Sequence, residues 1–308
     1  MNDSLRVLLP ATMHVLQRGW LSSNNILFLG QEQTALVDSG YATHATQTVA
    51  LVAQVLHGRP LDWLVNTHIH SDHCGGNAAL QQAYGCRTFI PAAEASKVRD
   101  WDQGALSYVA TGQQCARFHV DATLQGGDEI ILGDMTWQVL AAPGHDPHSL
   151  ILYCPQHRIL ISADALWENG FGVIFPELDG QSGFAEARET LEMIAALDVA
   201  IVIPGHGRPF TDVASALSSA FSRLDYLSAE PIRNAQNGLK VLLKFLLLER
   251  QKISLEDVSQ IVATMPLMVS TNARHLHLPN DQLTAWLIAQ LLRAGAAQLD
   301  GEVLLNSD

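Results

Sequence analysis

The 308-residue sequence contains few charged residues, few aromatic residues and few cysteines. Charged residues make up 16% and aromatic residues 6% of the chain, against 48% hydrophobic residues. This composition excludes a disordered chain and predicts a large buried core. The cysteines form no CxxC pair and are too sparse for a disulfide-stabilised secreted domain, so we expect reduced thiols. They are Cys74, Cys86, Cys115 and Cys154.

The sequence also lacks an apolar run long enough to cross a bilayer. Its most apolar stretch, residues 241–248, is short and contains Lys244. The first 20 residues lack the basic start, the long apolar segment and the small-residue cleavage site of a signal peptide. These absences predict a cytoplasmic protein that makes no contact with a membrane.

Positive charge is scarce in the first part of the chain. The formal net charge is −13. Residues 221–308 hold 8 basic and 9 acidic side chains, so nearly all of the excess negative charge lies in residues 1–220. An acidic surface of this kind disfavours wrapping by a long polyanion. A small-molecule substrate is therefore favoured over a nucleic acid, although a local basic patch is not excluded.

Short apolar strands alternate with helices up to about residue 212. Strands are expected at 25–29, 34–38, 61–66, 87–90, 129–132, 136–141, 150–154, 159–163 and 199–203, and helices at 43–57, 78–84 and 184–197. Strands mixed with helices in this way indicate an α/β protein whose sheets are covered by helices.

The pattern becomes mainly helical after residue 212. Helices are expected at 213–228, 232–250, 255–264 and 281–294, with Ser254 as the cap of the third, and a hairpin is expected within 295–304. Three helices followed by a hairpin outline a winged helix. We therefore expect a catalytic domain at residues 1–212 and a helical, winged-helix-like domain at residues 213–308.

The segment with the clearest chemistry holds His68, His70, Asp72 and His73. Such a dense cluster of imidazoles and a carboxylate is costly to bury unless something binds it. In an extended segment His68 and His70 point the same way, and Asp72 and His73 follow round a turn. This arrangement can present two ligands to each of two adjacent cations.

Three further candidate ligands follow the ends of later strands. His145 and His206 each come directly after a Pro-Gly pair, and Asp164 ends the strand expected at 159–163. Loops held by a rigid scaffold commonly carry function. Gly75 and Gly76, directly after the first cluster, let the backbone pass close to the site.

The HxHxDH pattern, the two histidines after Pro-Gly and the strand-terminal aspartate together resemble the metallo-β-lactamase superfamily, over about residues 13–210. The resemblance implies an αββα sandwich with metals at the edge of two packed sheets. It implies that the first metal is held by His68, His70 and His145, that the second is held by Asp72, His73 and His206, and that Asp164 bridges them. Nitrogen and carboxylate ligands favour two zinc ions, with iron or manganese left open.

Two such ions, roughly 3.5–4 Å apart, lower the pKa of a shared water towards neutrality. The resulting bridging hydroxide would attack a carbonyl carbon or a phosphorus. Asp72 would orient this hydroxide and accept its proton, and so is the expected catalytic residue. We expect hydrolysis of a small ester, thioester or lactone.

Other activities share this motif. A glyoxalase II-like thioesterase has the full ligand set, but its usual basic C-terminal segment for glutathione is not matched here. A β-lactamase is usually exported, and a persulfide dioxygenase uses one iron held by fewer ligands. The tail resembles that of a quinolone-signal thioesterase, where helices cap the pocket. It also resembles an endoribonuclease branch, for which the modest basic cluster Lys240, Lys244, Arg250 and Lys252 would be relevant. A regulatory protein with little turnover, and a homo-oligomer, stay open.

Several residues near the motifs are better explained by structural roles than by catalysis. His148 is expected to orient a ligand or to be a plain loop residue, and Cys74 to be a small buried side chain, with the other cysteines in the core. His275 and His277 are expected at the surface. The aromatic residues of the loop 167–176 form either a wall of the substrate site or a layer packed beneath the C-terminal helices.

Overall fold

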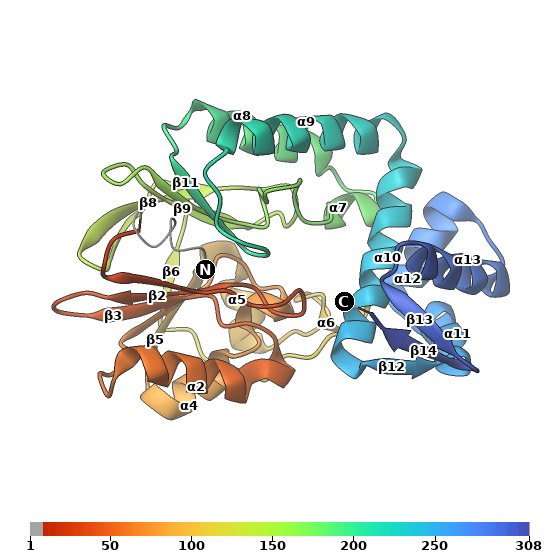
Figure 1. The fold of residues 1–308 in the computed structure, drawn as a ribbon, viewed down its shortest axis with the longest axis horizontal. Helices are drawn as coiled ribbons and strands as arrows, with labels where there is room; N and C mark the ends of the chain where they lie inside the picture. Colours follow the sequence, from red (N-terminus) through yellow and green to blue (C-terminus); the bar gives the residue numbers. More distant parts are fainter. Residues whose placement is uncertain (1–8, 308) are drawn as a thin grey trace.

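The computed structural model describes residues 9–307, so the first eight residues of the N-terminal segment interpreted above lie outside the described part. Two β-sheets face each other between outer helices (Figure 1). The first sheet has the order β1-β2-β3-β4-β5-β6, antiparallel up to β3 and parallel from there. Its strands are β1 (Met13–Leu16), β2 (Asn25–Leu29), β3 (Thr34–Val37), β4 (Trp63–Val65), β5 (Arg87–Pro91) and β6 (Ala122–Leu124).

The second sheet has the order β11-β10-β9-β8-β7, and only its β10–β11 pair is parallel. Its strands are β7 (Glu129–Leu132), β8 (Met135–Ala141), β9 (Leu150–Cys154), β10 (Ile159–Ala163) and β11 (Ile201–Pro204). Every residue of β9 and β10 is buried, because these strands are covered by the first sheet on one face and by helices on the other. This explains why they appear in the sequence as continuous apolar runs.

The core between the sheets follows from the alternation of side chains along each strand. On β8, Met135, Trp137 and Val139 are buried between the sheets while the intervening residues face outward. Trp137 is completely buried and contacts Phe28 of the first sheet edge-on, with ring centroids 5.5 Å apart. This shared core fixes the two sheets, and therefore the loops at their common edge.

Helices cover both outer faces. Helices α2 (Ala45–Leu56) and α4 (Asn77–Tyr84) lie against the first sheet, and α8 (Phe184–Ala196) and α9 (Val213–Ala229) lie against the second (Figure 1). The four layers are therefore helix, sheet, sheet, helix, which confirms the expected αββα sandwich.

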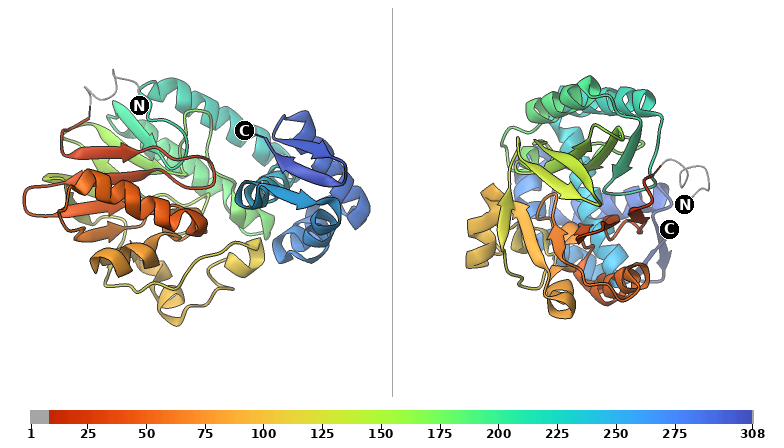
Figure 2. Two further views of the ribbon diagram at one scale, coloured as in Figure 1. Left: turned by 60° about the horizontal axis from the view of Figure 1, so that its bottom comes forward. Right: turned by 90° about the vertical axis from the view of Figure 1, so that its left-hand side faces the viewer.

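The C-terminal region, grouped at one end of the sandwich (Figure 2, left), forms an apolar cluster that also includes Val173 and Leu178. Its elements are α10 (Pro231–Arg250), β12 (Lys252–Ser254), α11 (Leu255–Thr264), α12 (Pro266–Thr271), α13 (Asn280–Arg293), β13 (Ala297–Asp300) and β14 (Val303–Asn306). The expected hairpin is β13–β14, and β12 joins it as a third strand. Ser254 caps α11 by accepting a hydrogen bond from the Asp257 backbone N–H, as predicted.

The prediction missed the short elements, which lack a clear hydrophobic period. These are β1, β6, β12, α12, a π-helical turn at Asn272–Leu276, and the short helices α3 (Ser71–Cys74), α5 (Ala95–Asp100), α6 (Tyr108–Thr111) and α7 (Phe175–Leu178). The strand expected at 199–203 begins only at Ile201. Among residues 9–307, no helix is both long enough and apolar enough to cross a membrane.

Two adjacent isoleucines on β7 test the core directly. Ile130 is 6% exposed between the sheets and Ile131 is 57% exposed on the outer face. We expect Ile130→Ala to lower the free energy of unfolding by about 2–5 kcal/mol, because it removes buried methyl groups and leaves a cavity. The matched Ile131→Ala change should cost less than about 1 kcal/mol in urea unfolding. Equal costs would contradict this arrangement of the core.

Candidate metal centre

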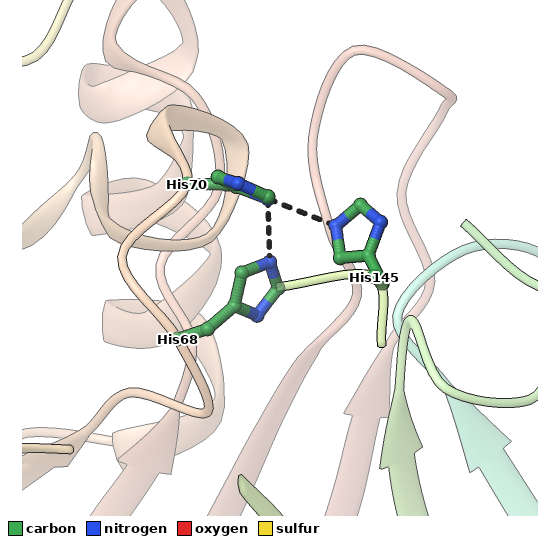
Figure 3. Close-up of side chains that lie close together, drawn as sticks. All are labelled: His68, His70 and His145. Atoms are coloured by element: carbon green, nitrogen blue, oxygen red, sulfur yellow. Dashed lines mark hydrogen bonds between the residues drawn. The ribbon is translucent and has the colours of Figure 1, made fainter. Parts of the chain in front are cut away.

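Three imidazole nitrogens meet at the edge where the two sheets end (Figure 3). His70 Nδ1 lies 3.1 Å from His68 Nε2 and 2.8 Å from His145 Nε2. His68 and His70 follow β4 and His145 follows β8, so residues far apart in sequence meet here. Ligand atoms around one tetrahedral zinc ion stand about 3.3 Å apart, which is close to this spacing.

In His68 and His145, Nδ1 is hydrogen-bonded on the side away from the site, which leaves Nε2 free to act as a ligand. His145 Nδ1 donates to the Val173 carbonyl oxygen, at 2.6 Å. The Thr67 hydroxyl donates to Asp38, so it accepts from His68 Nδ1. His145 Nε2 and His68 Nε2 therefore carry lone pairs that point inward. A cation resolves this convergence of lone pairs better than a single shared proton does.

A second group lies beside the first. His73 Nε2 is 3.5 Å from Asp164 Oδ2 and 3.9 Å from Asp72 Oδ2, and His206 Nε2 is 3.0 Å from Asp72 Oδ2. His73 Nε2 is buried and has no hydrogen-bond partner among the described residues. Asp164 Oδ2 is also 3.4 Å from His145 Nε2, so Asp164 lies between the two groups. All seven predicted residues are thus brought together.

Asp38 fixes both halves of the site from beneath. Its Oδ2 accepts from the Thr67 hydroxyl and from His73 Nδ1, each at 2.8 Å, and its Oδ1 accepts the Thr67 backbone N–H at 2.9 Å. Asp38 is 2% exposed and has a left-handed backbone, with φ of 57°. Sequence analysis treated this residue only as the end of a strand. Its position before a turn gave no sign of its contact with His73.

Backbone irregularities aim Asp164 at the site. The β10–β11 register shifts between Ile161 and Ala163, and Ala163 has φ of 45°. Such a bulge redirects the next side chain, here Asp164. Gly205, in the Pro-Gly-His-Gly segment, passes so close that a Cβ there would collide with Asp164 Oδ1. This explains the requirement for glycine before His206.

Gly75 confirms the expected close approach of the backbone after the first cluster. A Cβ at Gly75 would collide with the backbone N of Ala42, and one at Gly76 with the Ser39 carbonyl oxygen. The glycines let α3, which carries Asp72 and His73, lie directly against the loop after β3.

The electrostatics match the needs of metal ligands. Burial and the neighbouring imidazoles hold the pKa of His68 well below its usual value, and burial with the charge of His70 lowers the pKa of His145 to about 4. Both rings are therefore neutral at pH 7, as a ligand must be. Burial alone would raise the pKa of Asp164, but His73 and His206 outweigh it and leave the pKa well below normal.

His73 behaves differently. Burial lowers the pKa of this histidine, but the carboxylates of Asp164, Asp38 and Asp72 outweigh burial and leave the pKa well above its ordinary value. These carboxylates thus favour a positive charge at His73 Nε2, whether a proton or a metal ion supplies it. The unpartnered nitrogen, the facing carboxylates and the inward lone pairs all fit bound cations.

A cavity opens from the site towards the C-terminal helices. Trp20 and Trp167 line it beside His206: Trp20 stacks on the imidazole with ring centroids 5.6 Å apart, and Trp167 meets it edge-on. The Trp167 indole N–H also donates to Asp164 Oδ1, at 3.2 Å. The far side is lined by residues of α9 and α10, namely Arg223, Asn237, Val241, Leu242 and Phe245.

Both interpretations of the aromatic loop hold. Trp167, Phe171 and Phe175 line the cavity, and the helix that Phe175 begins, α7, contacts α10. Trp20 was not predicted as a site residue. It follows a glycine in an irregular segment, which carries no sequence signal.

The remaining candidates lie outside the cluster. His148 contacts Glu94, with Nε2 to Oε1 at 3.6 Å, and not a ligand; it is Asp146 that lies 3.7 Å from His70 Nε2. His275 and His277 do not line the cavity. Cys74 is fully buried, as expected, and lies 3.8 Å from the sulfur of Cys115. Cys115 lies in an irregular loop and is only partly buried, packed against the cluster that contains Cys74.

Comparison with known proteins identifies the family of this arrangement. The model of the metallo-beta-lactamase superfamily matches residues 18–206. Hydroxyacylglutathione hydrolase of Hyphomonas neptunium is 28% identical over 43% of this chain and 46% of its own length. That of Brucella anthropi is 29% identical over 50% of this chain and 51% of its own. The chain thus spans about half the length of these curated relatives.

Solved structures share the fold. A metallo-beta-lactamase family protein from Thermus thermophilus aligns with a TM-score of 0.58 at 18% identity, covering 96% of this chain and 99% of that one. A protein crystallised in a di-iron-bound form aligns with a TM-score of 0.54 at 24% identity, covering 67% of this chain and 98% of that one.

The role of Asp38 can be tested against a matched aspartate. We expect Asp38→Asn to weaken zinc affinity about 10- to 100-fold, because it removes the charge that orients His73. Asp134 also has a left-handed backbone, with φ of 64°, and accepts a backbone N–H, but at a distant turn. Asp134→Asn should leave the affinity unchanged in competition with a chromophoric chelator. Equal affinities for both variants would refute the role given to Asp38.

Proposed function

This chain belongs to the metallo-beta-lactamase superfamily, and we propose that it is a binuclear metal-dependent hydrolase of a small ester, thioester or lactone. The observation that supports this most strongly is the meeting of seven ligand-type side chains, five of which line one cavity. The hydroxyacylglutathione hydrolases among its relatives favour a thioester within this group.

We assign His68, His70 and His145 to the first ion, Asp72, His73 and His206 to the second, and Asp164 to both. The ligand atoms of each triad lie within 4.8 Å of one another. Histidine and carboxylate ligands suit zinc, with iron or manganese as alternatives. When bound, such ions would supply a nucleophilic hydroxide at neutral pH and would polarise the oxygen of the carbonyl group whose carbon is attacked. The complete second triad favours two ions over the single iron of a dioxygenase.

The protein side chains then position and protect the reaction. Asp72 is partly exposed to the cavity, so its carboxylate can accept the proton that the attacking water releases. The Trp167 indole N–H holds Asp164 in place through its Oδ1. Phe175, Val241 and Phe245 line the substrate space with apolar groups, which exclude bulk water and strengthen the electrostatic interactions inside.

We propose that the C-terminal region forms a separate winged-helix-like domain that caps the cavity of the catalytic domain. Helix α9 packs on the second sheet of the sandwich, so this cap begins with α10 and not at the boundary expected after residue 212. Its first long helix, α10, supplies Val241, Leu242 and Phe245 to the cavity wall. A cavity closed on this side fits a small molecule better than a polynucleotide. Lys244, one of the cations considered for nucleic acid, donates instead to the carbonyl oxygens of Ala296 and Ser307 and to Asn306.

The proposal predicts a metal-dependent esterase or thioesterase. The protein purified without added metal should hold close to two equivalents by elemental analysis and should hydrolyse a generic thioester or lactone. Chelation should abolish this activity and zinc should restore it, because the ions supply the nucleophile. Activity that survives complete metal removal would contradict the proposal, and so would phosphodiester cleavage as the only activity.

Asp72 tests the protein's own part in the chemistry. Asp72→Asn should lower kcat by about 100- to 10,000-fold at saturating zinc, because the amide cannot accept a proton. Asp198→Asn, at an exposed aspartate paired with Arg158, is the control and should keep wild-type kcat. A D72N enzyme with normal kcat would exclude Asp72 as the proton acceptor.

A further inference from the structure

The part of the cavity next to the C-terminal domain holds nitrogen donors without partners. Arg223 of α9 and Asn237 of α10 line the same cavity as the metal-ligand residues. Arg223 Nε and Asn237 Nδ2 are both buried, and neither has a hydrogen-bond partner within residues 9–307. Leaving such donors unpaired is costly, so this pair calls for an acceptor that the chain itself does not provide.

Arg223 lines the cavity with a buried, unpaired Nε and, unlike several other arginines, has no carboxylate partner among the described residues. Arg158, Arg188, Arg208 and Arg233 each contact a carboxylate. Arg223 has no ion pair in the described part of the chain, and its guanidinium lies over the ring of Phe171, 5.7 Å from the centroid. An arginine kept without a carboxylate inside an acidic protein is suited to bind an anion from outside.

The position of Arg223 is fixed by the loop that follows Asp164. Gly170 has φ of 110°, and a Cβ there would lie 2.8 Å from Arg223 Cδ. Phe171, the next residue, also lines the cavity. The short loop that follows Asp164, the candidate bridging ligand, thus also contacts Arg223. This contact fixes the position of the guanidinium relative to the metal centre.

The surroundings add positive charge. Burial and the nearby charge of Arg223 lower the pKa of Lys240, which places this lysine beside the arginine. Asn237, Lys240 and Arg293 line an adjoining groove of about 330 Å³. No aspartate or glutamate lines that groove or the C-terminal side of the cavity within the described residues. Lys244 also borders the groove but is held by the C-terminal strands.

We propose that Arg223 and Asn237 bind a carboxylate carried by the substrate, so that the enzyme acts on an acidic small ester or thioester. This inference rests on the proposed hydrolase function and specifies its substrate class. Arginine recognises the planar carboxylate through two parallel N–H donors, and the Asn237 amide adds a further donor. The apolar wall of Val241 and Phe245 then contacts the chain between the carboxylate and the reacting carbonyl.

The test uses matched thioesters that differ in one charge. Mono-S-ethyl thioesters of succinic, glutaric and adipic acid are compared with their terminal carboxamides. For the best chain length, the wild-type enzyme should show a KM about tenfold to a hundredfold lower for the acid than for the amide, the range expected of a charge-assisted hydrogen bond. Equal KM values across the series would overturn the proposal without any variant.

Arg223→Gln then locates the effect. It should raise KM for the acid by a similar factor, with kcat and the KM of the amide changed less than about twofold. Arg158→Gln, on an exposed arginine paired with Asp198, is the matched control and should change neither. An R223Q enzyme that weakens both substrates equally would mean a packing role for Arg223 and would contradict the inference.

A binding measurement separates this inference from the proposed function. Quenching of tryptophan fluorescence by glutarate, with glutaramide as the neutral control, reports on the cavity flanked by Trp20 and Trp167. Glutarate binding that R223Q removes, in a protein that hydrolyses no ester, thioester or lactone, would support the anion site and refute the hydrolase. Thioester hydrolysis without any preference for the acid would leave the hydrolase standing and refute the anion site.

Discussion

The site depends on one electrostatic constraint: buried lone pairs and carboxylates converge without enough protons to satisfy them. His73 Nε2 faces Asp164 and Asp72 and has no partner within residues 9–307, while the nitrogens of His68 and His145 point at His70. Burying such a set is costly unless cations occupy the centre. The two metal ions we propose would satisfy the arrangement, because each would have three side chains plus a shared carboxylate.

The fold meets this constraint by rigidity around the ligands. The two sheets share one core, so the loops after β4, β8, β10 and β11 emerge at a common edge. Asp38 ties His73 to Thr67 and, through Thr67, to His68. The bulge before Asp164 and the glycine before His206 bring backbone and carboxylate into contact distance. Strain at a few backbone positions is thus stabilised by the surrounding core.

Much of this could be predicted from the sequence, because hydrophobic runs mark β9 and β10 and the histidine motifs carry their own spacing. The layer order and the assignment of the seven residues to one site came from the resemblance to the metallo-β-lactamase superfamily that these motifs carry. Asp38, Trp20 and the position of Arg223 in the cavity could not be predicted, since each depends on contacts with residues distant in the chain. Short elements such as α3 and β12 were missed because three or four residues show no period. Cys115 packs at the margin of a core cluster and not within it, because its loop leaves the side chain partly exposed.

The most direct test of the central claim is X-ray diffraction from zinc-loaded crystals at wavelengths on either side of the zinc absorption edge. The account predicts two anomalous peaks roughly 3.5–4 Å apart, the spacing of binuclear sites. One should be bound by His68, His70 and His145, the other by Asp72, His73 and His206, with Asp164 between them. A single peak, or peaks away from these side chains, would contradict the binuclear site and the hydrolase function inferred from it.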